Sequence, residues 1–124
     1  MANNFKIMVV DDSSTVRKTA ELILSKEGYE IVSEIDGFNA LSHLEEVKPN
    51  LIFMDVMMPN LDGYDTCQII KGSPSELSKT PVIMLTSKDG AFDKARGQLA
   101  GCDAFITKPF TRDDLISVIE KFKQ

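Results

Sequence analysis

The chain contains no tryptophan, one histidine and two cysteines, and no apolar run approaches the roughly 20 residues that a bilayer-spanning helix needs. The segment Met1–Lys6 also lacks the apolar stretch of a secretory signal, so we expect a cytoplasmic protein without membrane insertion. Cys67 and Cys102 fall in different predicted elements and are not spaced like a zinc site or a redox pair. We therefore expect two reduced, packed thiols.

Positive charge is also in short supply. The 14 basic residues face 19 acidic ones, which leaves a formal net charge of −5. Such a balance opposes non-specific attraction to phosphate backbones, and the lysines and arginines are scattered rather than arranged in a stripe. We therefore expect no nucleic-acid binding and no membrane-surface binding.

The length and the apolar content fit a single domain. With 124 residues, of which 43% are hydrophobic, the chain can bury a core of its own. We expect residues 1–124 to form this one domain. Because the chain ends directly after its last predicted helix, we expect no separate output domain.

Five short apolar runs alternate with stretches of helical spacing. The predicted strands are Ile7–Val10, Tyr29–Ile35, Leu51–Met54, Val82–Leu85 and Ala104–Ile106. The predicted helices contain Val16–Leu24, Ala40–Leu44, Tyr64–Lys71, Phe92–Leu99 and Leu115–Phe122, and Thr111 is a suitable cap for the last. Five strand–helix units predict an α/β fold, a doubly wound parallel sheet of five strands with helices on both faces. For the strand order we adopt the flavodoxin-like 2-1-3-4-5 of known folds.

Polar side chains stand at the ends of the predicted strands. Asp11 and Asp12 follow the first strand, Asp55 ends the third, Thr86 follows the fourth and Lys108 follows the fifth. In the adopted order these strands are consecutive neighbours about 4.8 Å apart, and ligands of such sheets bind beyond the carboxyl ends. The sequence therefore predicts one site centred on Asp55.

Three carboxylates in one place repel one another unless a cation lies between them. Mg²⁺ prefers oxygen ligands and keeps several waters, so it suits Asp11, Asp12 and Asp55. The alternative is that the paired acids only cap the helix that begins at Ser13 or Ser14.

The ordered set of motifs resembles the receiver domains of bacterial response regulators over essentially the whole chain. The matching residues are Asp11-Asp12, Phe53–Pro59 with Asp55 inside it, Asp62-Gly63, Thr86 and Lys108-Pro109-Phe110.

The resemblance implies that Asp55 accepts a phosphoryl group from a histidine kinase in a Mg²⁺-dependent reaction. It implies that Asp12 and Asp55 bind the metal directly, that Asp11 acts through water, and that the Met57 backbone carbonyl completes the protein ligands. The chain would then be a switch that promotes its own phosphorylation and dephosphorylation, not an enzyme that acts on other substrates.

The resemblance also implies roles beside the phosphoacceptor. Lys108 and Thr86 would contact the phosphoryl oxygens, and Phe105 would turn inward when Thr86 moves. Met57 and Lys88 occupy positions that tune the lifetime of the phosphorylated form in the family, and the Lys108-Pro109 bond would be cis.

Two segments, Ser87–Gly97 and Asp62–Cys67, are similar to PilG-type receivers, which serve the chemotaxis-like systems that control type IV pili and twitching motility. This similarity implies a chemotaxis-type histidine kinase as phosphodonor. The downstream partner would be a pilus or signalling protein that contacts the fourth helix, the fifth strand and the fifth helix.

Two other classes share parts of this pattern. A flavodoxin-like cofactor binder would have the same layers, but Asp11 and Asp12 would repel a flavin phosphate. An aspartate-nucleophile phosphatase would place its nucleophile after the first strand and add a cap domain. His43 lies away from the predicted site, and we expect a surface side chain there.

Overall fold

The computed structural model describes residues 5–87 and 91–123, and side chains within the fourth helix from residue 93 onward. The strands are β1 (Lys6–Val10), β2 (Glu30–Glu34), β3 (Leu51–Asp55), β4 (Val82–Thr86) and β5 (Ala104–Thr107). The helices are α1 (Ser14–Lys26), α2 (Gly37–Val47), α3 (Gly63–Lys71), the 3-10 helix η1 (Glu76–Lys79), α4 (Ala91–Ala100) and α5 (Arg112–Phe122).

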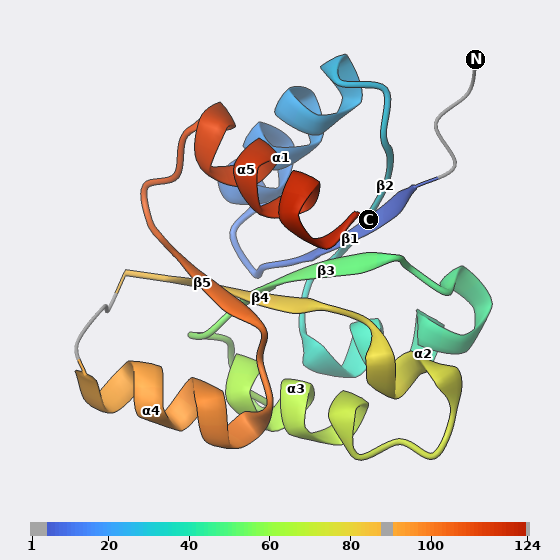
Figure 1. Cartoon of the computed structure of the whole chain (residues 1–124), viewed down its shortest axis with the longest axis vertical. Helices are drawn as coiled ribbons and strands as arrows, with labels where there is room; N and C mark the ends of the chain where they lie inside the picture. Colours follow the sequence, from blue (N-terminus) through green and yellow to red (C-terminus); the bar gives the residue numbers. More distant parts are fainter. Residues whose placement is uncertain (1–4, 88–90, 124) are drawn as a thin grey trace.

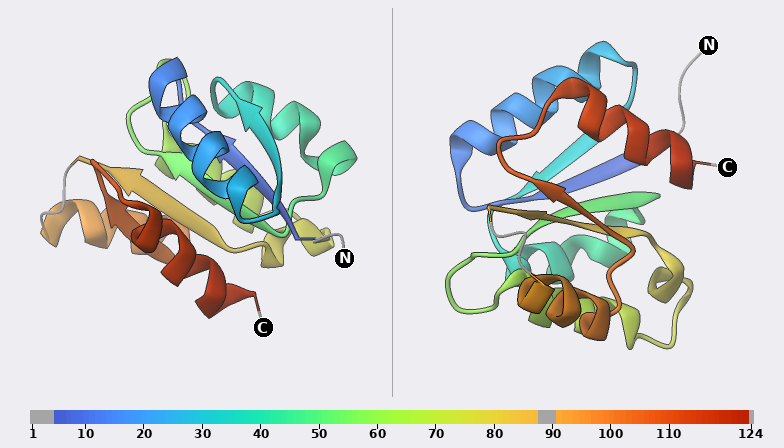
Figure 2. Two further views of the ribbon diagram at one scale, coloured as in Figure 1. Left: turned by 90° about the horizontal axis from the view of Figure 1, so that it is seen from above. Right: turned by 60° about the vertical axis from the view of Figure 1, so that its left-hand side comes forward.

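All neighbouring strands are parallel and their order is β2-β1-β3-β4-β5, as predicted. Helices α1 and α5 cover one face of the sheet, and α2, α3 and α4 cover the other (Figure 1). Two further views show the same arrangement, with helices on both faces of the sheet (Figure 2). The carboxyl ends of β1, β3 and β4 lie together on the left of Figure 1.

The central strands β1, β3 and β4 are apolar without alternation because both of their faces are covered. Burial divides the core into two clusters, one on each side of the sheet. Phe53, Leu24 and Leu115 belong to the cluster under α1 and α5, whereas Met54 and Ile70 belong to the other. Removing these side chains from water supplies most of the stabilisation of the fold.

Local signals set the ends of several helices. Ser13, Asp36 and Asp62 cap α1, α2 and α3 through their side chains, and Thr111 forms a capping box with Asp114 at the start of α5. Gly28 follows α1 with a φ of 87°, a left-handed conformation that favours glycine.

Helix α4 exists where it was predicted, but Ala95 and Leu99, two of the apolar residues that suggested it, do not face the core. Ala95 is exposed and Leu99 is 87% exposed, whereas Gly97 and Ala100 are buried. The side chain of Phe92 lies outside the described part of the chain. The reason is that α4 packs inward through its smallest residues, which periodicity of large apolar residues does not reveal.

Two further features agree with the predictions. Cys67 and Cys102 are both free thiols, and the Lys108-Pro109 peptide bond is cis. Among the described helices, none combines the length and the apolar character that a membrane span requires.

Candidate functional site

The strand-end residues meet at one edge of the sheet. Asp11 and Asp12 follow β1 and Asp55 is the last residue of β3, and one carboxylate oxygen from each lies within 4.8 Å of the other two. Lys108 follows β5, and its Nζ is 2.9 Å from Asp11 Oδ2 and 3.0 Å from Asp55 Oδ1. The structure therefore brings four of the predicted site residues into one cluster.

Every polar group of Asp11, in the backbone and in the side chain, forms a hydrogen bond. Its Oδ1 accepts the Ser13 backbone N–H at 2.9 Å, and its Oδ2 accepts from Lys108. Its own N–H donates to the Glu34 carbonyl at 3.1 Å, and its carbonyl accepts from Arg17 Nη1 at 2.7 Å. The residue is fully buried, so its position and orientation are tightly defined.

The other two carboxylates of the cluster differ from each other in exposure to solvent. Asp12 is exposed, while Asp55 is only 4% exposed. Burial raises the pKa of Asp55 to about 6; Lys108 opposes the shift and the charge of Asp11 adds to it. Burial alone would lower the pKa of Lys108, but its hydrogen bonds to Asp11 and Asp55 outweigh burial and raise it.

The charges of this cluster do not balance. Three carboxylates lie beside one ammonium group, which contacts Asp11 and Asp55, and all the ligand atoms that the carboxylates offer are hard oxygens. This donor set fits a hard divalent cation such as Mg²⁺ and does not suit a soft metal. The alternative, in which Asp11 and Asp12 only cap the first helix, does not explain why Asp55 and Lys108 lie beside them. The N-cap of α1 is also Ser13 rather than either acid.

The loop after β3 is drawn close to the Asp55 backbone. Gly63 N donates to the Val56 carbonyl at 2.9 Å, and a Cβ on Gly63 would overlap the Asp55 carbonyl. A side chain at this position would push the loop away from the end of β3. The Asp62-Gly63 pair therefore combines the α3 cap with a close backbone approach.

Of the remaining predicted site residues, Thr86, Phe105 and Met57 lie in the described part of the chain. Thr86 is 2% exposed at the end of β4, and its carbonyl accepts the Lys108 N–H at 2.8 Å. Phe105 is partly buried on β5. The Met57 side chain is 60% exposed, and its backbone N–H is 3.4 Å from Asp55 Oδ1. Lys88 lies outside the described residues.

The structure adds contacts that the sequence did not reveal. Arg17 reaches the Asp11 carbonyl from α1, and no local pattern marks it for this role. His43 is 47% exposed, as a surface residue would be, but its Nδ1 lies 2.9 Å from Oε2 of the buried Glu34. Because the Glu34 carbonyl accepts the Asp11 N–H, the His43–Glu34 pair is joined to the acidic cluster through the backbone of Asp11.

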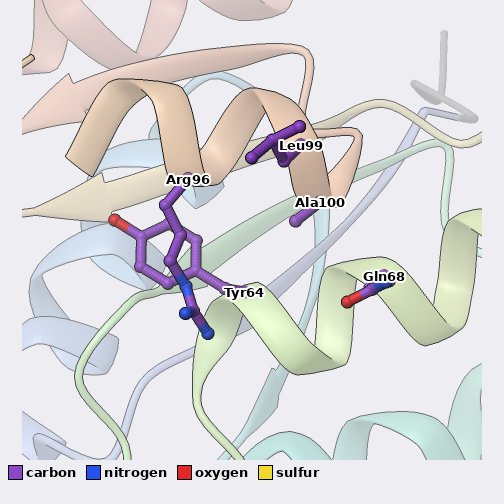
Figure 3. Close-up of a pocket in the computed structure, with 5 residues that line it drawn as sticks. All are labelled: Tyr64, Gln68, Arg96, Leu99 and Ala100. Carbon is purple, nitrogen blue, oxygen red and sulfur yellow. The ribbon is translucent and has the colours of Figure 1, made fainter. Parts of the chain in front are cut away.

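A separate hollow lies between α3 and α4. Tyr64, Gln68, Arg96, Leu99 and Ala100 line a cavity of about 200 Å³ (Figure 3). The Arg96 guanidinium stands over the Tyr64 ring, 5.0 Å from its centroid. None of the strand-end residues lines this hollow, so it is not part of the acidic site.

Comparison with known proteins agrees with this geometry. The family model described as "Response regulator receiver domain" matches residues 7–120. The chain belongs to this family. It is 50% identical over 119 residues to protein PilG of Pseudomonas aeruginosa, which covers 96% of this chain and 87% of PilG.

Two solved structures show the same fold. Chemotaxis protein CheY4 of Vibrio cholerae superposes with a TM-score of 0.91 at 28% identity, over 97% of this chain and 99% of that one. The receiver domain of a sensor histidine kinase from Pseudomonas aeruginosa superposes with a TM-score of 0.88 at 27% identity, over 97% and 98% of the two chains. That structure holds a magnesium ion coordinated in its active-site cleft. The predicted family and fold are thereby confirmed.

Proposed function

We propose that residues 1–124 act as a single-domain switch in which Asp55 accepts a phosphoryl group from a chemotaxis-type histidine kinase. The observation that carries this proposal is the position of the buried Asp55 carboxylate at the ends of the strands. It lies in a cluster of three carboxylates and accepts a hydrogen bond from Lys108. A cytoplasmic location is part of the proposal.

In the transfer step, an Asp55 carboxylate oxygen attacks the phosphorus of a phosphohistidine. A P–O bond to Asp55 forms while the P–N bond breaks, and the imidazole leaves with the electron pair of that bond. The Lys108 ammonium, already 3.0 Å from Asp55 Oδ1, neutralises charge on the phosphoryl oxygens, and the Thr86 hydroxyl donates to one of them. Later attack by water at phosphorus breaks the P–O bond to Asp55, which releases inorganic phosphate and returns the carboxylate.

The metal ligands of this proposal are the carboxylates of Asp12 and Asp55 and the Met57 carbonyl, with Asp11 acting through water. Mg²⁺, when bound, would supply the charge neutralisation that one lysine cannot give alone. Asp11 is already held by Ser13 and Lys108, which is consistent with an indirect role. The exposed Asp12 is open to solvent and to an arriving ion.

The phosphodonor needs a surface next to Asp55. A mostly apolar hollow of about 410 Å³ lies beside Lys108, between α1 and the loop that leads into α5. It is lined by Thr15, Val16, Thr19, Ser87, Lys108, Pro109 and Phe110. A kinase domain that covers this hollow would bring its phosphohistidine to the open edge of the site.

The output would be a change of protein contacts at α4, β5 and α5, governed by Thr86 and Phe105. The identity to PilG supports a role in type IV pilus function or twitching motility. A chemotaxis-type receiver with a different output is the second candidate, supported by the likeness to CheY4. Flavin binding is disfavoured because the carboxylates of Asp11 and Asp12, clustered with that of Asp55, would repel a flavin phosphate.

One experiment tests the chemistry. The protein is incubated with Mg²⁺ and acetyl phosphate, and intact mass is recorded over time. We expect one added phosphoryl group, which disappears when Mg²⁺ is removed with a chelator. Asp12→Ala is the matched variant that should bind Mg²⁺ more weakly and react more slowly. No added mass, or a stable modification at another residue, would overturn the proposal.

A second experiment tests the transmission. Thr86→Ala keeps the nucleophile and the carboxylates, so it should still bind beryllofluoride, a stable mimic of the phosphoryl group. Its NMR shift response in α4 and α5 should be reduced, because a contact made only in one state is missing. A full wild-type response in this variant would show that Thr86 does not couple the site to these helices.

A further inference from the structure

Gly97 lies in the interior of α4 directly against the Phe105 ring. An ideal Cβ built on Gly97 would overlap the ring tip, with Cε1 at 2.8 Å, and would lie 3.1 Å from Cys102 Sγ. These distances are below normal van der Waals contact, so any larger residue at this position collides with the ring. The absence of a side chain is what allows Phe105 to pack against the helix backbone.

A glycine at this position weakens the helix that contains it. Gly97 is the seventh of the ten residues of α4, where alanine is clearly more favourable than glycine. Two residues earlier in the same helix, the exposed Ala95 is an alanine. The cost at Gly97 therefore accompanies close packing against the Phe105 ring and Cys102 Sγ, of which the ring is the nearer.

Helix α4 cannot easily move away to make room for a larger residue. On its other flank, the Tyr64 hydroxyl donates to the Asp93 carbonyl at 3.1 Å, and Arg96 lies over the Tyr64 ring (Figure 3). Arg96 Nη2 is also 3.8 Å from Asp62 and 3.7 Å from Asp65. Since α3 holds α4 in place, a side chain at position 97 is accommodated by displacement of the Phe105 ring.

We propose that Gly97 is a positioning residue of the switch, because it forms the socket that admits the Phe105 ring to its place against α4. Filling the socket holds the ring out of this place and makes the α4–β5 surface insensitive to the state of Asp55. The proposal rests on the function proposed above, in which Phe105 takes part in transmission. The socket itself is a packing statement that does not depend on phosphorylation.

Thermal unfolding tests the socket, because Gly97→Ala should change Tm in opposite directions in two backgrounds. In the wild type, Gly97→Ala should lower Tm by several degrees because the new methyl group meets the ring. In Phe105→Ala/Cys102→Ala, which removes both neighbours, Gly97→Ala should raise Tm by about 3–5 °C, the effect of helix propensity alone. Ala95→Gly is the matched control, and it should lower Tm by a similar amount.

NMR with beryllofluoride tests the consequence for the switch. Gly97→Ala should accept the phosphoryl group from acetyl phosphate within about twofold of the wild-type rate, since Gly97 does not touch the acidic cluster. Its Phe105 ring signals should differ from wild type before the mimic is added, and should change little when it binds. Wild type and Ala95→Gly should show the full response.

The outcomes separate the two proposals. If Gly97→Ala raises Tm in the wild type as well, or keeps the full Phe105 response, the socket is wrong. If the wild type itself fails to bind beryllofluoride, the proposed function falls, while the Tm comparison still decides the packing. If Gly97→Ala does not fold, a folded Gly97→Ala/Phe105→Ala/Cys102→Ala variant supports the socket and an unfolded one overturns it.

Discussion

Two lysine–aspartate clusters lie at opposite edges of the same sheet. At the carboxyl edge, Lys108 Nζ is 2.9 Å from Asp11 and 3.0 Å from Asp55. At the amino edge, where β4 and β5 begin, Lys71 Nζ is 2.8 Å from Asp103 Oδ2 and donates to the Thr80 carbonyl at 2.7 Å. The two lysines are similarly buried, with side-chain exposures of 22% and 17%.

The clusters differ in charge balance. Asp103 pairs with one lysine, and its Oδ2 also accepts the Val82 N–H at 2.8 Å, so the ends of α3, β4 and β5 are joined with no excess charge. The Lys108 cluster has three carboxylates for one ammonium, and the pKa of Asp55 is raised to about 6 by burial. A balanced pair stabilises the fold, whereas an unbalanced one leaves negative charge that attracts a cation.

The largest expected effect is that of Asp55→Asn. The amide is nearly isosteric with the carboxylate but is a poor nucleophile, so phosphorylation by acetyl phosphate should be abolished while the far-UV CD spectrum is unchanged. Intact mass is the measurement. A phosphorylated Asp55→Asn protein would mean that another residue is the acceptor, and the comparison of the two clusters would lose its basis.

Lys108→Ala should separate two roles of the lysine. Loss of the positive charge near the phosphoryl oxygens should slow phosphorylation by roughly 100-fold. Mg²⁺ should bind more tightly, because Lys108 no longer competes for Asp11 and Asp55, and a metal titration measures this. Weaker Mg²⁺ binding in the variant would contradict the competition that the two short contacts imply.

Lys71→Met should show the opposite pattern. It keeps the aliphatic stem but leaves Thr80 and Asp103 without the ammonium donor, so we expect a loss of about 1.5–3 kcal/mol in the free energy of unfolding. Urea unfolding gives this value. The phosphorylation rate should stay within about twofold of wild type, and a larger change would show that the amino edge also influences the site.

The smallest effect concerns pH in the metal-free protein. The folded state binds a proton at Asp55 up to a pKa of about 6, whereas an unfolded chain ionises this group near 3.8. The folded state therefore holds more protons between these values, and its stability should fall as pH rises from about 4 to 6 by roughly 2 kcal/mol. Urea unfolding of wild type in chelator, minus the same series for Asp55→Asn, isolates this contribution. A difference that is flat with pH would refute the raised pKa.

Sequence and structure agree most where the signals are local. The strands were placed to within one residue at each end because continuous apolar runs mark buried parallel strands. The predicted cap at Thr111 is present, and Ser13 and Gly28 at the two ends of α1 follow the same chemistry of single residues. The buried face of α4 could not be predicted in the same way, because it packs through the small residue Gly97, whereas hydrophobic periodicity relies on large apolar side chains.

By itself, the sequence determined the α/β class and which polar residues stand at the carboxyl ends of the strands, because these ends lie at one edge of a parallel sheet. That Asp11, Asp12, Asp55 and Lys108 lie in one site followed only with the strand order adopted from known folds. Only the tertiary structure decided that Lys108 and Asp11, 97 residues apart, share a hydrogen bond, that Lys71 is a structural partner of Asp103, and that Phe105 occupies the space over Gly97. These contacts join residues from different elements, and a local pattern carries no information about the distance between side chains that meet only when helices and strands are packed.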